Sequence, residues 1–252
     1  MESGLLGKKV FFLHPPPVLI EVIDGLARQE FEVYLARDHE RLRRAVSAFP
    51  DAIVFANIDD GLDEQGWLRF VEGLRKELPS LGIGVVTLND DPGLRERYLM
   101  GLQIQCGFVI LKVGSAKTAE ILAKTLEANE ARGRRKFVRA ACAPGLAQCA
   151  VELEGVRYSA ELFDLSSAGA ALRFDGGASF RAGTVLRDMA LSVKGQRVAA
   201  SGVVVAERDD EGGAIHVVMF DPASLDEARR DKLKSIVYRI NQGSMDAILE
   251  KA

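Results

Sequence analysis

The first half of the chain alternates short apolar runs with segments in which apolar residues recur every three or four positions. Residues 10–13 and 53–55 are unbroken apolar runs, which are typical of strands buried on both faces of a sheet. Trp67 and Phe70 illustrate the helical spacing of the segments between these runs. Five strand and helix units in succession predict a doubly wound, five-stranded parallel sheet with helices on both faces. We expect this α/β domain to occupy residues 1–127.

The pattern changes after residue 127. Residues 128–140 are rich in charge and predict a basic linker. Apolar and polar residues then alternate with the period of strands in six segments, which are residues 147–153, 157–165, 170–174, 185–193, 198–206 and 214–220. Six short strands separated by turn residues predict an antiparallel, six-stranded β-barrel. A helical apolar stripe follows, with Ser224 and Glu227 as a capping box, so we expect the barrel and a C-terminal helix to occupy residues 141–252.

Composition and charge exclude several classes of function. The net charge is −3 over 252 residues, whereas a domain that binds nucleic acid polymers usually carries a basic face. No apolar run is long enough to span a bilayer, and residues 1–9 lack the apolar core of a signal peptide. We therefore expect a cytoplasmic protein without membrane insertion. The three cysteines and three histidines lack the spacing of metal ligands, so we expect no metal site and no cofactor.

The first domain resembles the receiver domain of response regulators over residues 8–127. The resemblance rests on the order of strands and helices, on Thr87 at the fourth strand and on Lys112 at the fifth. Receivers accept a phosphoryl group on an aspartate at the end of the third strand, beside a magnesium ion that neutralises charge on the transferred oxygens. The acceptor position here falls on Ala56, which has no nucleophile.

The acidic residues that hold the magnesium ion in receivers are missing as well. His14-Pro15-Pro16 follows the first strand, where the family has acids. Asp59 and Asp60 lie near the acceptor position but out of register. We therefore predict a receiver-like scaffold without a phosphoacceptor. Two alternatives are that Asp59 takes over as the acceptor, or that another ligand enters the cleft.

Two groups of residues around the start of the barrel suit an anionic ligand. Arg135 and Arg139 stand four positions apart, and guanidinium groups bind phosphates through paired hydrogen bonds and stack on flat bases. Asp164 offers acceptors for the N–H donors of guanine, Ser166 adds a hydroxyl, and Gly169 permits a positive φ and a close backbone approach. Each group alone has a simpler interpretation, which is a solvated charge run or an Asx turn that ends at glycine. Together they predict a site for an anionic ligand that bears guanine.

The conjunction of Arg-x-x-x-Arg before a small barrel with Asp-x-Ser-x-x-Gly at the end of its second strand resembles the PilZ domain over residues 133–242. PilZ domains are bacterial receptor modules for cyclic di-GMP. The resemblance implies that the two arginines of the motif bind phosphate and guanine, that the aspartate and the serine contact guanine, and that the backbone near Gly169 lets the ligand lie against the barrel. Arg134 directly precedes the arginine pair and has two open interpretations: it holds a second, stacked ligand molecule, or it faces water.

We expect a receptor and not an enzyme, because no pair of nucleophile and base and no phosphate-binding loop stands out. Cyclic di-GMP is expected to order the linker, change the domain arrangement and so signal through a protein partner. The main alternative is a constitutive adaptor whose PilZ barrel binds a protein and no nucleotide, and a receiver that transfers phosphoryl groups is a third. A homodimer is suggested only by analogy with the exposed faces of receivers.

Overall fold

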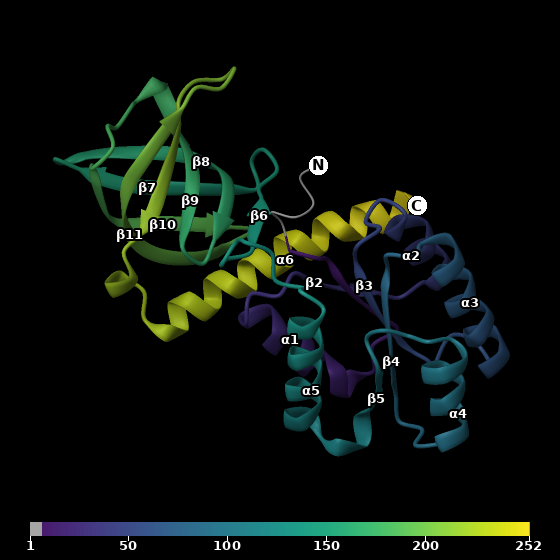
Figure 1. The fold of residues 1–252 in the computed structure, drawn as a ribbon. Helices are drawn as coiled ribbons and strands as arrows, with labels where there is room; N and C mark the ends of the chain where they lie inside the picture. The colour runs from purple at the N-terminus through teal and green to yellow at the C-terminus, as the bar shows by residue number, and fades with distance from the viewer. Residues whose placement is uncertain (1–6, 252) are drawn as a thin grey trace. The chain divides into compact units, whose positions relative to one another are not determined.

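The computed structural model describes residues 7–251 and is drawn in Figure 1. The chain divides into two compact units. The first unit extends to Lys136 and includes the residues from Gln242 onward, and the second unit is Phe137–Asn241. Because compactness does not test which segments fold independently, the predicted boundaries at residues 127 and 140 stay predictions. Within residues 7–251, no helix combines the length and the apolar character that a membrane crossing requires.

The first unit contains a parallel sheet of five strands in the order β2-β1-β3-β4-β5. The strands are β1 (Val10–Leu13), β2 (Val33–Ala36), β3 (Ile53–Asn57), β4 (Gly82–Thr87) and β5 (Phe108–Ile110). The helical segments are α1 (Pro17–Arg28), α2 (His39–Val46), α3 (Glu64–Glu77), α4 (Pro92–Glu96), the π-helix η1 (Arg97–Gly101), the 3₁₀ turn η2 (Leu111–Val113) and α5 (Ser115–Ala128). The strand order reverses between β1 and β3, as in receivers and flavodoxin-like folds, so the predicted receiver-like fold is confirmed.

Buried side chains on both faces of this sheet explain the unbroken apolar runs. Every residue of β1 and of β3 is buried. Figure 1 shows α1 and α5 on one side of the sheet and α3 and α4 on the other. Trp67 and Phe70 of α3 point into the core, and their rings meet edge to face with centroids 5.6 Å apart.

The second unit is a closed antiparallel barrel. Its strands are β7 (Ala147–Leu153), β8 (Val156–Ser166), β9 (Gly169–Phe174), β10 (Val185–Val193), β11 (Gln196–Arg208) and β12 (Ile215–Phe220). They pair in the order β8-β7-β10-β11-β12-β9, and the pairing of β8 with β9 closes the barrel. The predicted six-stranded barrel is therefore confirmed. The barrel encloses an apolar core, because inward and outward side chains alternate along its strands. In β7, for example, Ala147, Cys149 and Val151 are buried, whereas Gln148 between them is exposed.

Three shorter segments and one long helix complete the second half of the chain. They are β6 (Arg139–Ala141), the 3₁₀ turns η3 (Asp175–Gly177) and η4 (Pro222–Ser224), and α6 (Glu227–Lys251). Strand β6 begins in the predicted linker and ends at the first residue of the predicted barrel segment, and it was not expected. These three residues form a strand because they pair with the last residues of β8, Asp164 to Ser166.

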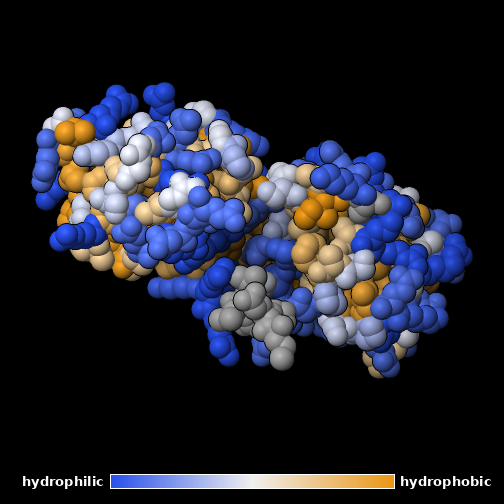
Figure 2. Space-filling view, turned by 90° about the horizontal axis from the view of Figure 1, so that it is seen from above, coloured by the Kyte–Doolittle hydropathy of each residue, from blue (hydrophilic) through white to orange (hydrophobic). Residues whose placement is uncertain are grey.

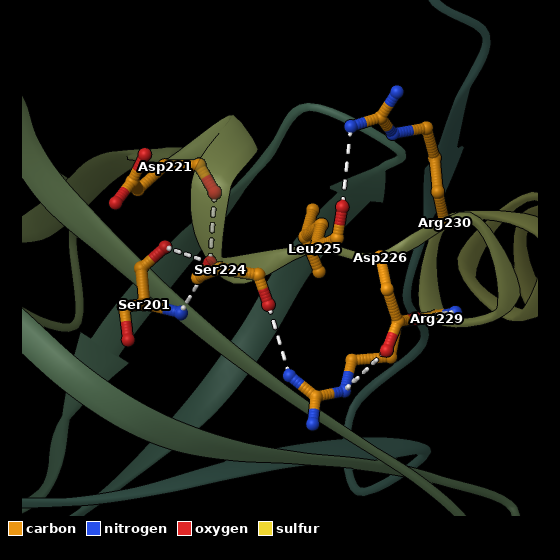
Figure 3. A network of polar contacts seen from close by, with 7 residues as sticks. All are labelled: Ser201, Asp221, Ser224, Leu225, Asp226, Arg229 and Arg230. Atoms are coloured by element: carbon orange, nitrogen blue, oxygen red, sulfur yellow. Dashed lines mark hydrogen bonds and ion pairs between the residues drawn. The ribbon is translucent and has the colours of Figure 1, made fainter.

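The start of α6 differs from the predicted capping box. Asp226 caps the helix, since its side chain accepts a hydrogen bond from the Arg229 N–H at 2.8 Å. The Ser224 hydroxyl is used elsewhere, because it accepts a hydrogen bond from the Ser201 N–H of β11 at 3.0 Å (Figure 3). The predicted capping box of Ser224 and Glu227 is therefore wrong. The hydroxyl instead ties η4 to the barrel.

The apolar residues of α6 are divided between the two cores. Leu233, Ile236, Val237 and Ile240 belong to the barrel core. Met245 and Leu249 belong to the core of the first unit. In that unit the side chain of Gln242 donates to the Leu35 carbonyl at 3.0 Å and accepts from the Leu35 N–H at 2.8 Å. Gln242 thereby satisfies backbone groups of β2, which is an edge strand of the sheet.

Candidate functional site

Strand β6 brings the last arginine of the first motif beside the second motif. In the antiparallel pairing of β6 with β8, Arg139 lies opposite Ser166 and Ala141 lies opposite Asp164. Ala140 and Leu165, which form the pair between them, are fully buried. Because side chains alternate across a strand, the flanking pairs lie on the opposite side of the strands from this core pair. Arg139 and Ala141 are exposed there, whereas Asp164 is half-buried and Ser166 is buried. The structure thus brings together Arg139, Asp164 and Ser166.

Ser166 shapes the turn between β8 and β9. Its hydroxyl donates to the Gly169 carbonyl at 3.1 Å and accepts from the N–H groups of Gly169, at 3.1 Å, and of Ala168, at 3.3 Å. A serine hydroxyl has one hydrogen and two lone pairs, so these three bonds use its whole capacity. The turn is therefore built by Ser166, not by an Asx turn at Asp164. The predicted contact of Ser166 with a ligand stays a prediction.

Gly169 is required by packing between strands. Its φ is not among the positive values of the described glycines, so the positive φ that a glycine permits is not used here. A Cβ at this position would lie 2.4 Å from the carbonyl oxygen of Val218 in β12. The absence of a side chain at Gly169 thus lets β9 approach β12 closely. The expected approach of a ligand to the Gly169 backbone stays a prediction.

Arg139 and Asp164 both keep their charged groups available. Arg139 is exposed, and within residues 7–251 neither its guanidinium nor the Asp164 carboxylate forms an ion pair or a side-chain hydrogen bond. The backbone of Arg139 is held, because Asn241 of α6 donates to its carbonyl at 3.1 Å. Burial and, second, the nearby Asp164 carboxylate raise the pKa of the Cys142 thiol to about 11. A fixed strand thus presents a cation and an acceptor that a ligand can pair with.

The remaining cations of the basic segment differ in their contacts. Arg132 has partners within the first unit. Its guanidinium forms an ion pair with the Glu127 carboxylate at 3.5 Å and lies over the Phe31 ring, 4.4 Å from the ring centroid. Arg134 and Arg135 are exposed and form no ion pair with any residue of the described chain. Their predicted roles in ligand binding stay predictions.

The receiver-like cleft has no free carboxylate at the acceptor position. Ala56 is buried in β3 with 1% of its surface exposed. The Asp59 carboxylate accepts hydrogen bonds from the Thr87 hydroxyl and, at 2.6 Å, from the Leu88 N–H. Asp59 thus anchors the loop after β4, and Thr87 is its partner. Lys112 is exposed in η2. Among residues 7–251, no cluster of three or more metal-ligating side chains occurs.

Incubation with acetyl phosphate and Mg²⁺ is therefore expected to leave the mass of the protein unchanged. Ala56 has no nucleophile, and the Asp59 carboxylate is held by two donors. Intact-mass spectrometry checks this, with a phosphorylatable receiver as the positive control. A magnesium-dependent gain of one phosphoryl group that maps to Asp59 or Asp60 would contradict the expectation.

Part of the second half of the sequence matches a known domain family. The profile of the PilZ domain family matches residues 133–239. The structure of the PilZ domain of Escherichia coli YcgR with c-di-GMP aligns with a TM-score of 0.39 and 15% identity, covering 45% of this chain and 96% of that one. The crystal structure of Escherichia coli YcgR in complex with c-di-GMP aligns with a TM-score of 0.42 and 13% identity, covering 48% of this chain and 52% of that one.

The first unit aligns with a different group of proteins. The isolated receiver domain of RcsB from Salmonella enterica serovar Typhimurium has a TM-score of 0.40 and 19% identity, with 52% of this chain and 95% of that one covered. No protein of curated function matches the sequence. The family match includes the Arg-x-x-x-Arg motif and the Asp-x-Ser-x-x-Gly motif, and it shows that residues 133–239 of this protein form a PilZ domain.

Proposed function

We propose that this protein is a receptor for cyclic di-GMP that changes its domain arrangement when the ligand binds and then signals through a protein partner. One observation supports this most directly. Arg139 and Asp164 lie on neighbouring strands next to the Ser166 turn, and neither has an ionic partner within the described chain. A cation and a carboxylate left unpaired side by side suit a ligand that supplies both an anion and N–H donors.

The proposed roles follow from these chemistries. Arg135 and Arg139 hold phosphate and stack on or pair with guanine. Asp164 accepts from the N1–H and the amino group of guanine. Ser166 and Gly169 place these groups, because the hydroxyl builds the turn and the glycine lets β9 approach β12. Arg134 either holds a second ligand molecule or faces water, which the ligand stoichiometry distinguishes.

Titration of the full chain with cyclic di-GMP tests the proposal. Isothermal calorimetry is expected to give a Kd of about 1 μM or lower, which corresponds to about −8 kcal/mol. A constitutive adaptor with a PilZ barrel would give no heat and no displacement of labelled ligand at high protein concentration. No measurable binding would therefore reject the receptor and favour the adaptor.

Replacement of Asp164 by alanine should reduce selectivity for guanine. We expect a larger loss of affinity for cyclic di-GMP than for cyclic di-AMP, because adenine lacks the N1–H and N2 donors that the carboxylate accepts. Competition binding with both ligands measures the two losses. Glu152→Ala, at an exposed acidic position of β7, serves as the control and should change neither affinity. Equal losses for the two ligands would mean that Asp164 only shapes the strand.

Ligand binding should also slow hydrogen exchange across residues 131–140. Five cations between Arg132 and Arg139 repel one another without ligand, and the two phosphates of cyclic di-GMP would neutralise part of that charge. The ligand can shift the domain equilibrium only by its different affinity for the two arrangements. Exchange measurements and small-angle scattering with and without ligand check the prediction. Protection confined to residues 164–169, with an unaltered scattering curve, would exclude the conformational change.

A further inference from the structure

The outer face of the barrel continues from the candidate site onto two further strands. Gly169 of β9 lies opposite Met219 of β12, and Met219 lies opposite Val203 of β11. With Arg139 opposite Ser166, and Ser166 bonded to Gly169, these pairings form one row across five strands. The row is cationic at β6 and apolar at β12 and β11.

Met219 is the exposed apolar residue of this row. Met219 is 56% exposed, whereas its chain neighbours Val218 and Phe220 are buried, with 1% and 3% of their surface exposed. Alternation along β12 therefore directs Met219 to the outer face. On the face drawn in Figure 2, hydrophilic residues cover most of the surface and apolar residues are confined to smaller areas. Met219 therefore does not contribute to the barrel core, although it lies beside the second motif.

The surface between the cation and the methionine carries little side chain. Gly169 has none, and the parallel row consists of Asp164, Ala171 and Val217. Adjacent strands lie about 4.8 Å apart, so the three steps from β6 through β8 and β9 to β12 span roughly 14 Å. Ser166 and Ala171 on this path are themselves buried, at 5% and 2% exposed. A path of small side chains, charged at one end and apolar at the other, suits a ligand that combines phosphates with flat rings.

We propose that Met219 binds a base: its thioether packs against a guanine ring while Arg139 holds a phosphate of the same ligand. This inference rests on the proposed function. A thioether is polarizable, and its contact with an aromatic ring is favourable at low conformational cost. Gly169, which has no side chain of its own, lies opposite Met219 in the register of β9 with β12. The residue lies outside both sequence motifs and adds an apolar contact to a site that is otherwise polar.

Calorimetric titration of the full chain with cyclic di-GMP compares Met219→Ala and Met219→Phe with the wild type. Alanine should weaken binding about two- to tenfold, because the sulfur contact with the ring is lost. Phenylalanine should restore the wild-type affinity or exceed it, because aromatic side chains stack on bases. Met100→Ala is the matched control, since Met100 is 73% exposed in the first unit, and it should bind as the wild type does. Thermal unfolding should be unchanged in all three variants.

A second variant gives a spectroscopic readout. The chain has one tryptophan, Trp67, which is fully buried in the first unit, so Met219→Trp adds the only exposed indole. Saturating cyclic di-GMP should quench the fluorescence of the added tryptophan beyond the change seen in the wild type. Wild-type affinity in Met219→Ala, an equal loss in the alanine and phenylalanine variants, or unchanged tryptophan emission would each overturn the assignment of Met219. Absence of binding to the wild type would instead reject the receptor function.

Discussion

Replacement of Arg139 by alanine should weaken the binding of cyclic di-GMP by about 1.5–3 kcal/mol, or about ten- to 150-fold in Kd. The reason lies in the position of Arg139 on β6. Its backbone is fixed by pairing with β8 and by the hydrogen bond from Asn241, while its guanidinium has no ionic partner within residues 7–251. A charge-assisted bond to phosphate at a fixed strand loses little conformational entropy, so its removal should appear almost fully in the affinity.

Two further substitutions sharpen this prediction. Arg139→Lys keeps the charge but loses the planar fork, so its affinity should fall between those of the wild type and the alanine variant. Arg132→Ala is the control from the same basic segment. Arg132 already contacts Glu127 and the Phe31 ring, so its loss should change the Kd by less than about threefold, a general electrostatic effect that salt screens. Equal losses for Arg139→Ala and Arg132→Ala would mean that the segment acts only through its net charge.

Replacement of Gly169 by alanine should lower the free energy of unfolding of the barrel by about 1–3 kcal/mol. The added Cβ would lie 2.4 Å from the Val218 carbonyl oxygen, which is backbone and cannot rotate away. Strands β9 and β12 would have to separate where Gly169 pairs with Met219. Because the same movement shifts the turn that Ser166 builds, affinity for cyclic di-GMP should fall as well.

Urea unfolding followed by circular dichroism measures the stability effect. Gly25→Ala is the control, because Gly25 lies in α1 with open space around its Cβ position. Alanine in a helix interior is favoured over glycine, so this variant should gain about 0.5–1 kcal/mol. The two substitutions are thus expected to have opposite signs. A Gly169→Ala variant as stable as the wild type would show that β9 and β12 tolerate a wider spacing.

Local periodicity was sufficient to predict most elements of the fold. The bounds of β7 and β10 agree with the predicted segments, residues 147–153 and 185–193, because alternation of apolar and polar positions is a property of each strand alone. Strand β6 could not be predicted in the same way. Its three residues have no periodic pattern, and they form a strand only through pairing with β8. The predicted cap of α6 is wrong for a related reason. The Ser224 hydroxyl accepts a hydrogen bond from the backbone N–H of Ser201, which is distant in the sequence.

The chemistry of the candidate site was already present in residue types and spacings. Two arginines four positions apart and an Asp-x-Ser-x-x-Gly segment specify a cation, an acceptor and a turn wherever they fold. The division of roles among them depends on contacts between strands distant in the chain. The Ser166 hydroxyl forms its hydrogen bonds within the turn between β8 and β9. Position 169 requires glycine because the Val218 carbonyl of β12 leaves no room for a Cβ. Met219 joins the row only through the register of β9 with β12. Spacing along the chain therefore determines which groups are available, whereas strand register decides which of them share one surface, because each strand exposes only every second side chain.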